Sequence, residues 1–422
     1  MPSKYQVLPP TAPVPAPDDY LERLVREGAQ KALQAAIEQE VDEFLGRLRY
    51  ERTEEFRGHR NGHLPARQIG VGTSCVEVRV PRVSKVPAEV SPDGYSSQIV
   101  PRYERRSRTQ ARLLVRLYLE GLSTGDFEPV FRSLVGETAA LSQQSILRLK
   151  GEWKQEFEAW RRRPLKKRYP YLFADGFYIK AGVEREKTAV LVVLGVDEKG
   201  QKELLAMEEG YRESRESWAG VLRSLKERGL SEAPLLLVGD GALGIWAALA
   251  AVFPSTQRAR CWNHRTLNLL DKLPKRLHKE AKMRVRELYE APDRAHCERL
   301  RDRLCEYWRG IGQLPAAECL ERDWEDFVSF YDFPEEHWIH LRTSNAIESI
   351  FAGVRLRTNG AKRMQVRENA LYLTFKLIVR LGLNWRSLNA PNQLQLLLQG
   401  HQFRDGKLVI DPPAAAASEV SA

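Results

Sequence analysis

The spacing of apolar positions predicts a helix followed by a short strand near the start of the chain. Between about 19 and 48, apolar residues recur at three- and four-residue steps, as on one face of a helix. Residues 73–82 alternate between apolar and polar side chains, which predicts a half-exposed strand. The Gly- and Arg-rich segment 51–63 separates them and does not favour long regular structure. Residues 1–18 are rich in Pro and Ala, which favours disorder.

Residues 109–150 have the pattern of a three-helix module. One helix ends at Gly121, a second runs from about 125 to 135, and a third begins with Ser142 as its predicted N-cap. A short turn between helices, with polar residues opening the last helix, is typical of a helix-turn-helix that reads the major groove. An inert three-helix bundle has the same pattern and stays an alternative. The side chains expected to contact DNA are Ser142, Gln143, Gln144 and Arg148.

From 171 onward the pattern becomes that of an α/β domain. The first three predicted strands are close enough in sequence for an antiparallel meander, and the later alternation of strand and helix favours parallel addition to the same sheet. The predicted strands are 171–180, 188–196, 201–209, 235–239 and 257–262, with helices at about 215–228 and 243–252.

The remainder of the chain is helical in pattern. Residues 265–340 are rich in Arg, Lys, Glu and Leu, and we interpret them as an insertion rather than part of the sheet. Helical periodicity resumes near 344–357 and 365–383. The segment after 411 is rich in Pro and Ala, and we expect it to be disordered.

Charge favours a polyanionic partner without proving one. The 422 residues include 66 Lys and Arg against 56 Asp and Glu, a formal net charge of +10. Basic side chains displace counterions from a phosphate backbone, so nucleic acid is a natural partner. The densest basic stretch, residues 150–168, is interpreted either as a phosphate-tracking connector or as a solvated linker.

The cysteines and the first residues indicate a soluble protein of the cytoplasm. Five cysteines at irregular spacing in a long chain are typical of free thiols in a reducing compartment. The first residues lack the apolar segment of a signal peptide, and the longest apolar runs are too short to span a bilayer.

Three carboxylates occupy unusual sequence contexts. Asp175 interrupts the strand-like run 171–179, Asp240 ends another apolar run between two glycines, and Glu348 begins a predicted helix. A carboxylate in or beside a buried strand loses hydration, a loss normally offset by a cation. Each one alone has a structural explanation, such as a turn or a solvated helix face. Together, three acidic oxygen donors on a basic chain suggest Mg²⁺ acting on phosphodiesters.

The motifs around these acids resemble those of bacterial Mutator-type insertion-sequence transposases, over residues from about 20 to 395. The segment from Asp240 to His264 is the most specific. The matching segments are Asp175-Gly176; Asp240 with Gly244-Ile245, Phe253-Pro254, Thr256 and Cys261-Trp-Asn-His264; Thr343-Ser-Asn-Ala-Ile-Glu348-Ser; Arg355-Leu-Arg-Thr358; and, nearer the N-terminus, Glu51-Arg-Thr53, Gly58-His-Arg-Asn-Gly62, Val80-Pro-Arg82 and Gly121-Leu-Ser-Thr124. One departure is Ala259, where the family usually carries Gln or Arg.

The resemblance implies an α/β catalytic core of ribonuclease H-like type, a mixed five-stranded sheet with helices, carrying an all-helical insertion. A mostly helical N-terminal DNA-binding region with a helix-turn-helix precedes it. The expected divisions are 1–18, a disordered tail; 19–105, an N-terminal helix and small β-containing DNA-binding region; 106–165, the helix-turn-helix domain and basic linker; 166–264, the first part of the core; 265–340, the insertion; 341–395, the second part of the core; and 396–422, a C-terminal tail.

The implied activity is that of an Asp-Asp-Glu transposase that binds terminal inverted repeats. Asp175, Asp240 and Glu348 would be both the catalytic residues and the metal ligands, with Mg²⁺ as cofactor and Mn²⁺ able to substitute. Asp175 would bridge two metal ions and the other two acids would each bind one. Water would free a 3′-OH at the element end, and that 3′-OH would then attack target or partner-strand DNA. The expected partners are inverted-repeat and target duplexes and a second copy of the chain, in a dimer or larger synaptic complex, in the cytoplasm at the bacterial nucleoid.

Other residues near the acids have less specific interpretations. Cys261 and His264 supply only half of a closed zinc site, so His264 is expected to contact DNA or to brace the site. Trp262 and Trp338 either stack on an unpaired base or belong to the core. Phosphate contacts are expected from Arg342, Asn345, Arg355, Arg357 and Lys362.

Two other functions stay open at this stage. One is a DNA-binding regulator derived from a silenced transposase, which would use only the helix-turn-helix. The other is a ribonuclease H-like nuclease that cuts RNA–DNA hybrids. The intact acidic triad argues against the first, and the N-terminal region and the insertion argue against the second. The sequence does not specify the inverted repeats, the target preference or the order of strand transfer, for which a circular intermediate is the family expectation.

Overall fold

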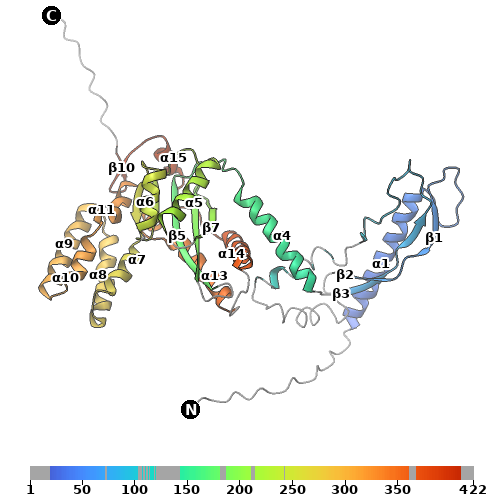
Figure 1. Cartoon of the computed structure of the whole chain (residues 1–422), viewed down its shortest axis with the longest axis horizontal. Helices are drawn as coiled ribbons and strands as arrows, with labels where there is room; N and C mark the ends of the chain where they lie inside the picture. Colours follow the sequence, from blue (N-terminus) through green and yellow to red (C-terminus); the bar gives the residue numbers. More distant parts are fainter. Residues whose placement is uncertain are drawn as a thin grey trace, which may run out of the picture. The chain divides into compact units, whose positions relative to one another are not determined.

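The computed structural model divides the chain after Leu147 into two compact units, Met1–Leu147 and Arg148–Ala422 (Figure 1). The described residues are 20–71, 74–102, 107, 110, 113, 115–117, 119, 143–180, 187–210, 214–241, 243–360 and 367–409. The predicted disordered tails, 1–18 and the residues after 411, lie outside them. Residues 121–142 of the predicted helix-turn-helix also lie outside, so that motif stays a prediction.

Among the described residues of the N-terminal unit, helix α1 packs against two short antiparallel ladders. Its apolar core joins the buried helix face at Ile37 to strand residues such as Val76 and Val78. Helix α1 confirms the predicted helix, and the bounds are α1 Tyr20–Leu45, β1 His59–His63, β2 Arg67–Val71, β3 Ser74–Val78 and β4 Pro81–Ser84. Strand β1 pairs with β4, and β2 pairs with β3.

The single strand predicted over 73–82 is two strands in the structure. The break falls at Arg79, whose backbone N–H donates to the Gln34 side chain at 3.0 Å while its carbonyl accepts from the same amide at 2.9 Å. These bonds replace ladder pairing with a contact to α1. Strands β1 and β2 were not predicted because the polar, Gly-containing sequence of β1 shows no apolar alternation.

The second unit contains the predicted mixed sheet. Its strands are β5 Tyr171–Lys180, β6 Lys187–Val196, β7 Lys202–Gly210, β8 Leu236–Gly239 and β9 Gln257–Arg260, in the order β7-β6-β5-β8-β9. The pairs β5–β6 and β6–β7 are antiparallel, and the pairs β5–β8 and β8–β9 are parallel, which confirms the predicted meander and the parallel addition. This arrangement is compatible with a ribonuclease H-like core.

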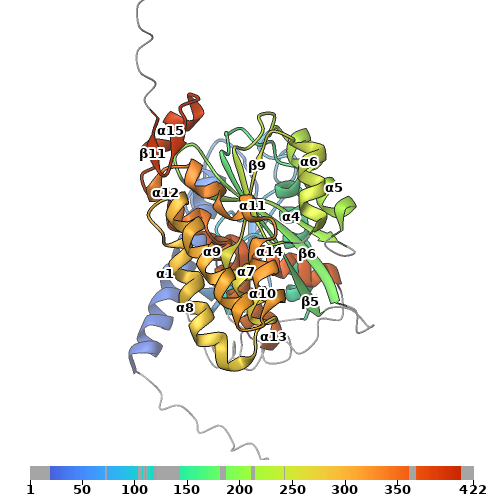
Figure 2. The ribbon, with the colours of Figure 1, turned by 90° about the vertical axis from the view of Figure 1, so that its left-hand side faces the viewer.

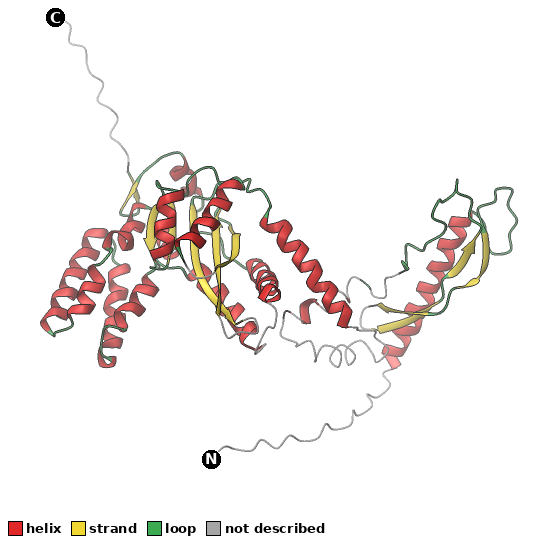
Figure 3. Ribbon diagram, viewed as in Figure 1, coloured by secondary structure: helices red, strands yellow, loops and turns green. Residues whose placement is uncertain are grey.

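Helices flank the sheet (Figure 3). Helices α5 (Arg215–Glu227) and α6 (Leu243–Val252) share one apolar core with strand residues such as Leu172 and Ala174. Alternate residues of β5 face the other way, where Phe177 contacts Phe351 of helix α13 with ring centroids 4.4 Å apart. Helix α13 spans Asn345–Gly360 and contacts β5, and α14 spans Arg367–Gly382 and contacts β7.

Residues 261–344, all of them described, contain helices and turns and no strand, as their periodicity predicted. Helices α8, α9 and α10 lie side by side in Figure 2, and contacts between α8 and α9 and between α9 and α10 agree with the view. The elements are α7 Trp262–Leu270, η1 Lys275–Leu277, α8 His278–Tyr289, α9 Arg294–Gly310, α10 Leu314–Glu321, α11 Trp324–Val328, η2 Ser329–Asp332 and α12 Glu335–Leu341.

The basic stretch before the sheet is engaged within the second unit. The stretch, residues 150–168, begins within helix α4 (Gln143–Arg161) and continues through the residues that connect α4 to β5. Arg161 pairs with Glu208 at 2.6 Å, Arg163 with Glu203 at 2.8 Å and Lys167 with Asp197 at 3.0 Å. These three cations have carboxylate partners on β7 and in the β6–β7 turn, whereas Lys154 and Lys166 are exposed and have no ion pair among the described residues. The phosphate-tracking role of the stretch therefore stays a prediction.

The segment expected as a tail from 396 is folded as far as 409. Helix α15 (Asn392–Leu398) leads to a hairpin of β10 (Phe403–Arg404) and β11 (Lys407–Leu408). The hairpin packs on the helical segment, since Gly406 donates to the carbonyl of Tyr331 at 3.1 Å and accepts from Glu335 at 3.2 Å. No described helix is long and apolar enough to cross a membrane. The five cysteines, all described, form no disulfide.

A buried histidine gives the second unit a testable pH dependence. His337 of α12 is fully buried, accepts from the Tyr171 hydroxyl at Nδ1 (2.8 Å) and donates from Nε2 to the Ala390 carbonyl (3.2 Å). Burial lowers the pKa of His337 to about 4. As pH falls from about 6.5 towards 4, the unfolded chain takes up a proton here that the folded chain does not, so folding stability falls.

Between pH 6.5 and pH 4 we therefore expect the free energy of unfolding of wild type to fall by about 3 kcal/mol more than that of His337→Gln. Urea unfolding followed by tryptophan fluorescence measures it for this unit alone, since all nine tryptophans lie after Leu147. Equal pH slopes for wild type and variant would show that His337 titrates normally in the folded protein.

Candidate functional site

The strand register places Asp175 and Asp240 side by side. Ala174 of β5 pairs with Gly239 of β8 in parallel, so the next residue of each chain segment is an aspartate. Neighbouring strands lie about 4.8 Å apart, and residues opposite each other point to the same face. Ala174 belongs to the core under α5 and α6, and therefore both aspartates face the α13 side. Asp175 is 7% exposed, and its Oδ1 accepts the N–H of Gly176 at 2.8 Å.

Helix α13 brings the third carboxylate to the same face. Phe351 lies one turn beyond Glu348 on α13 and packs on Phe177, which is two residues beyond Asp175 on the same face of β5. The predicted triad therefore occupies the predicted elements: Asp175 within a strand, Asp240 directly after one, and Glu348 in the first turn of a helix.

The carboxylate of Glu348 is oriented by neighbouring side chains. The fully buried Ser344 donates its hydroxyl to Oε1 at 2.7 Å, and the Cys261 thiol lies 3.6 Å from the same oxygen. The amide of Asn263 lies 3.5 Å from Oε2 and donates to the side-chain oxygen of Asn345 at 2.7 Å. The charge is thus held in position by polar contacts within the chain.

The turn between β9 and α7 is joined directly to the segment that leads into α13. Trp262 donates its backbone N–H to the carbonyl of Arg342 at 2.9 Å, and Ser344 donates its N–H to Cys261 Sγ at 3.2 Å. The Trp262 indole is fully buried and donates to the carbonyl of Phe327 at 3.0 Å. Trp262 and Trp338, which is 2% exposed, are core residues in this structure rather than exposed stacking platforms.

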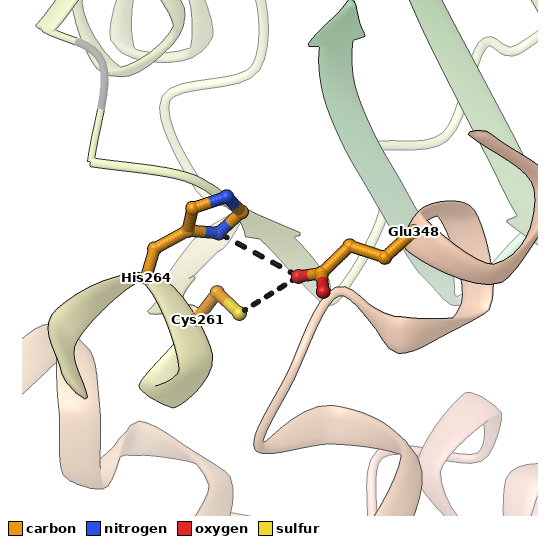
Figure 4. Close-up of side chains that lie close together, drawn as sticks. All are labelled: Cys261, His264 and Glu348. Carbon is orange, nitrogen blue, oxygen red and sulfur yellow. Dashed lines mark hydrogen bonds and ion pairs between the residues drawn. The ribbon is translucent and has the colours of Figure 1, made fainter. Parts of the chain in front are cut away.

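His264 lies between two of the acids. Its Nδ1 is 3.8 Å from Oδ1 of Asp240 and 3.7 Å from Oε1 of Glu348, as Figure 4 shows for Glu348. This nitrogen is buried and has no hydrogen-bond partner among the described residues. The expectation that His264 sits beside the acidic cluster is confirmed. A DNA contact by His264 stays a prediction.

Cys261 does not have the properties of a nucleophile. The side chain is 1% exposed, and burial raises the pKa of its thiol to about 11, so the thiol is protonated near neutral pH. Its contacts with Ser344 and Glu348 instead give it a positioning role.

The donor set fits a hard divalent cation. Asp175 and Asp240 follow paired residues of adjacent strands, and Asp240 and Glu348 both lie near His264 Nδ1. Among the described residues, the ligand atoms that lie within 4.8 Å of one another are those of Cys261, His264 and Glu348, so the three acids do not form such a group as they stand. Oxygen ligands of the kind that the three acids offer are those that Mg²⁺ prefers. The buried Nδ1 of His264 has no hydrogen-bond partner among the described residues, yet it lies 3.8 Å from a carboxylate oxygen of Asp240 and 3.7 Å from one of Glu348, so a protonated His264 would be an ion-pair partner of both acids. These residues could therefore hold a metal ion.

The predicted DNA contacts around Glu348 have different environments. The guanidinium of Arg342 stacks on Phe330 and Trp338, 5.2 and 5.5 Å from the ring centroids. Asn345 and Arg355 are exposed on α13. The side chain of Arg357 and the whole of Lys362 lie outside the described residues.

The predicted contacts of the helix-turn-helix are not described at the side-chain level. Gln143, Gln144 and Arg148 lie on the first turns of α4, whose side chains there lie outside the described residues, as does Ser142 altogether. Their DNA contacts stay predictions.

Sequence reasoning missed the residues that hold Glu348. Ser344 stands four residues before Glu348, a spacing that places side chains on one face of a helix start and could have identified it. Asn263 lies between Cys261 and His264 in a motif that was recognised without a role for it.

Sequence reasoning also missed a basic face on η1 and α8. Lys275, Lys279 and Lys282 follow one another at steps of four and three residues and are exposed, with Arg276 exposed beside them. No ion pair within 4.0 Å is found for these four among the described residues, whereas Arg286 pairs with Glu290 at 2.8 Å. The face begins shortly after α7, the helix that carries His264.

The Ser344–Glu348 hydrogen bond can be measured by a double-mutant cycle. We expect Ser344→Ala and Glu348→Ala to show a coupling energy of about 1 kcal/mol in urea unfolding. The reason is that either single variant already loses the hydrogen bond between the Ser344 hydroxyl and the Glu348 carboxylate. The matched cycle uses Ser349→Ala, since the Ser349 hydroxyl contacts Ala346 and not Glu348. Equal coupling in both cycles would contradict the assigned bond.

The matching family profile and the relatives described below are all transposases. The sequence profile described as "Transposase, Mutator family" matches residues 14–387. The chain is 42% identical over 303 residues to the transposase for insertion sequence element IS6120 of Mycolicibacterium smegmatis, covering 72% of this chain and 93% of that protein. It is 40% identical over 275 residues to the transposase for IST2 of Acidithiobacillus ferrooxidans, covering 65% and 93%.

A third relative extends over more of the chain. The transposase for ISRM5 of Rhizobium meliloti is 30% identical over 371 residues, covering 86% of this chain and 89% of that protein. The family profile, which matches residues 14–387, spans Asp175, Asp240 and Glu348. The chain belongs to the Mutator family of transposases.

Proposed function

We propose that this transposase cleaves and joins DNA strands at the cluster of Asp175, Asp240 and Glu348, using Mg²⁺. The observation that supports this most directly is the parallel register of β5 and β8, which sets Asp175 beside Asp240 on the face covered by α13. The relatives of this chain are named as transposases of insertion sequences. The substrates that we propose are the terminal inverted repeats of such an element and its target DNA.

The three carboxylates would hold Mg²⁺, with Mn²⁺ able to replace it. Bound metal neutralises charge on the phosphoryl group and on the attacking and leaving oxygens. Ser344 and Asn263 keep the Glu348 carboxylate oriented, so little reorganisation is needed when DNA arrives. Asp175 lies in a buried strand that pairs with β8, and this pairing fixes the position of its carboxylate relative to Asp240.

The strand chemistry needs no protein nucleophile. Water attacks the phosphodiester at the element end and frees a 3′-OH, and that hydroxyl then attacks a second phosphodiester. The protonated, buried Cys261 agrees with a direct displacement, because no reactive side chain is exposed beside the acids in the described cluster. We further propose that the N-terminal unit recognises the inverted repeats and that two copies of the chain pair the two ends.

Asp175→Asn tests the assignment. The variant keeps the shape of the side chain and removes its charge, so we expect Mg²⁺-dependent cleavage to fall at least about 100-fold while binding to element ends survives. Asp271→Asn, an exposed change after α7, is the matched control.

The same assay separates the other functions. An end-bearing duplex, a random duplex and an RNA–DNA hybrid are compared with Mg²⁺ present. Undiminished cleavage by Asp175→Asn would overturn the site. Preference for the hybrid would support a nuclease instead, and end binding without cleavage by wild type would support a regulator.

The basic face on η1 and α8 generates a second prediction. Lysines that displace counterions from DNA each contribute about 0.9 to the slope of log affinity against log salt. We therefore expect Lys279→Gln with Lys282→Gln to lower duplex affinity for all sequences and to reduce that slope by about 2. Lys199→Gln with Lys407→Gln makes the same charge change at exposed lysines on other elements. An equal loss of slope in both double variants would mean that only net charge matters.

A further inference from the structure

Three atoms near the acidic cluster have the geometry of a site for a softer metal. Cys261 Sγ, His264 Nδ1 and a carboxylate oxygen of Glu348 all lie within 4.8 Å of one another (Figure 4). The sulfur is 3.6 Å and the nitrogen 3.7 Å from Oε1 of Glu348. Around a tetrahedral Zn²⁺ with ordinary bond lengths, sulfur and oxygen lie about 3.6 Å apart, and nitrogen and oxygen about 3.4 Å apart.

We propose that Cys261, His264 and Glu348 bind a thiophilic divalent cation such as Zn²⁺ or Cd²⁺, and that this ion switches off the transposase by withdrawing Glu348 from the Mg²⁺ site. The binding stands on the geometry of the three side chains alone. The inhibition rests on the function proposed above, since it requires that Glu348 hold Mg²⁺.

Two of the ligands are built into the fold. Cys261 and His264 stand three residues apart at the start of α7, so their side chains project from one side of its first turn. The sulfur is buried, and the buried His264 Nδ1 has no hydrogen-bond partner among the described residues. In the neutral tautomer that carries its proton on Nε2, Nδ1 therefore has an available lone pair and can ligate a metal.

A fourth ligand is within reach. Oδ1 of Asp240 lies 3.8 Å from His264 Nδ1 but does not belong to the group of three ligand atoms that lie within 4.8 Å of one another, so it would bind only after moving towards the ion. This oxygen accepts the N–H of Gly241 and keeps a second lone pair. A water molecule could fill the same position.

The two kinds of ion compete because they share acids. Thiolate and imidazole favour Zn²⁺ and Cd²⁺, whereas Mg²⁺ prefers oxygen ligands only. An ion bound to Cys261 and His264 draws Glu348 towards α7, and Asp240 as well if it supplies the fourth ligand. On binding, the thiol proton passes to solvent and a sulfur–metal bond takes its place.

Cadmium titration of the full-length protein, without Mg²⁺ or DNA, tests the site. Wild type should gain the ultraviolet charge-transfer absorption of a cadmium thiolate, saturating at one ion. Cys261→Ser should lose the band and bind at least about 10-fold more weakly. Cys75→Ser, which removes a thiol from the other unit, should retain it. An unchanged band in Cys261→Ser would overturn the proposal.

His264→Gln keeps the thiol and provides a second variant if Cys261→Ser does not fold, with tryptophan fluorescence reporting the fold of both. It should also bind Cd²⁺ at least about 10-fold more weakly, and wild-type affinity would count against the site.

Two further measurements separate this proposal from the proposed function. Asp175→Asn should keep the cadmium band while it loses Mg²⁺-dependent cleavage, because Asp175 is not among the three ligands. Zn²⁺ should inhibit cleavage by wild type at lower concentration than cleavage by Cys261→Ser. Cadmium binding without any inhibition by Zn²⁺ would support the site and contradict the assignment of Glu348 to Mg²⁺.

Discussion

The position of Glu348 beside the two aspartates depends on one contact: the start of α13 packs against the turn between β9 and α7. Glu348 is 87 positions from Cys261 along the chain, and the intervening residues form only helices and turns. The bonds from Trp262 to Arg342 and from Ser344 to Cys261 close that loop beside the sheet. The buried indole of Trp262 ties the same turn to the helical segment through Phe327. Because of this docking, a residue outside the sheet faces two strand carboxylates.

Gathering these carboxylates has an electrostatic cost that the protein offsets only in part. Asp175 lies in a strand that is buried on both faces, and Asp240 and Glu348 each have an oxygen within 4.0 Å of Nδ1 of His264. Backbone N–H groups of Gly176 and Gly241 and the hydroxyl of Ser344 bond to the acids. The cationic side chains nearby are used elsewhere: Arg260 pairs with Asp323, and Arg342 stacks on aromatic rings. A bound cation would supply the remaining positive charge.

Local pattern predicted the second unit well and the first unit only in part. Strands β6 and β8 are apolar runs rich in valine and leucine, and β5 and β7 have apolar centres, so the positions and directions of these strands followed from length and spacing. Strand β1 is polar and exposed, and the break at Arg79 depends on a side chain of α1 that is 45 positions away. The sequence contexts of the three acids predicted their places within a strand, directly after a strand and at a helix start, and their role as metal ligands stays a prediction. The contact of Asn263 with Glu348 depends on the folding of the helical segment and has no local signal, whereas the four-residue spacing of Ser344 and Glu348 is a local signal and the place of His264 beside the acids was predicted.

The central claim is that Asp175, Asp240 and Glu348 converge on a divalent cation that contacts DNA. Anomalous X-ray diffraction from crystals of the protein with a DNA end and Mn²⁺ tests it directly. We expect an anomalous peak within about 2.5 Å of oxygens from all three carboxylates and beside a phosphate of the DNA. A metal bound elsewhere, or carboxylates that stay apart in the DNA complex, would contradict it.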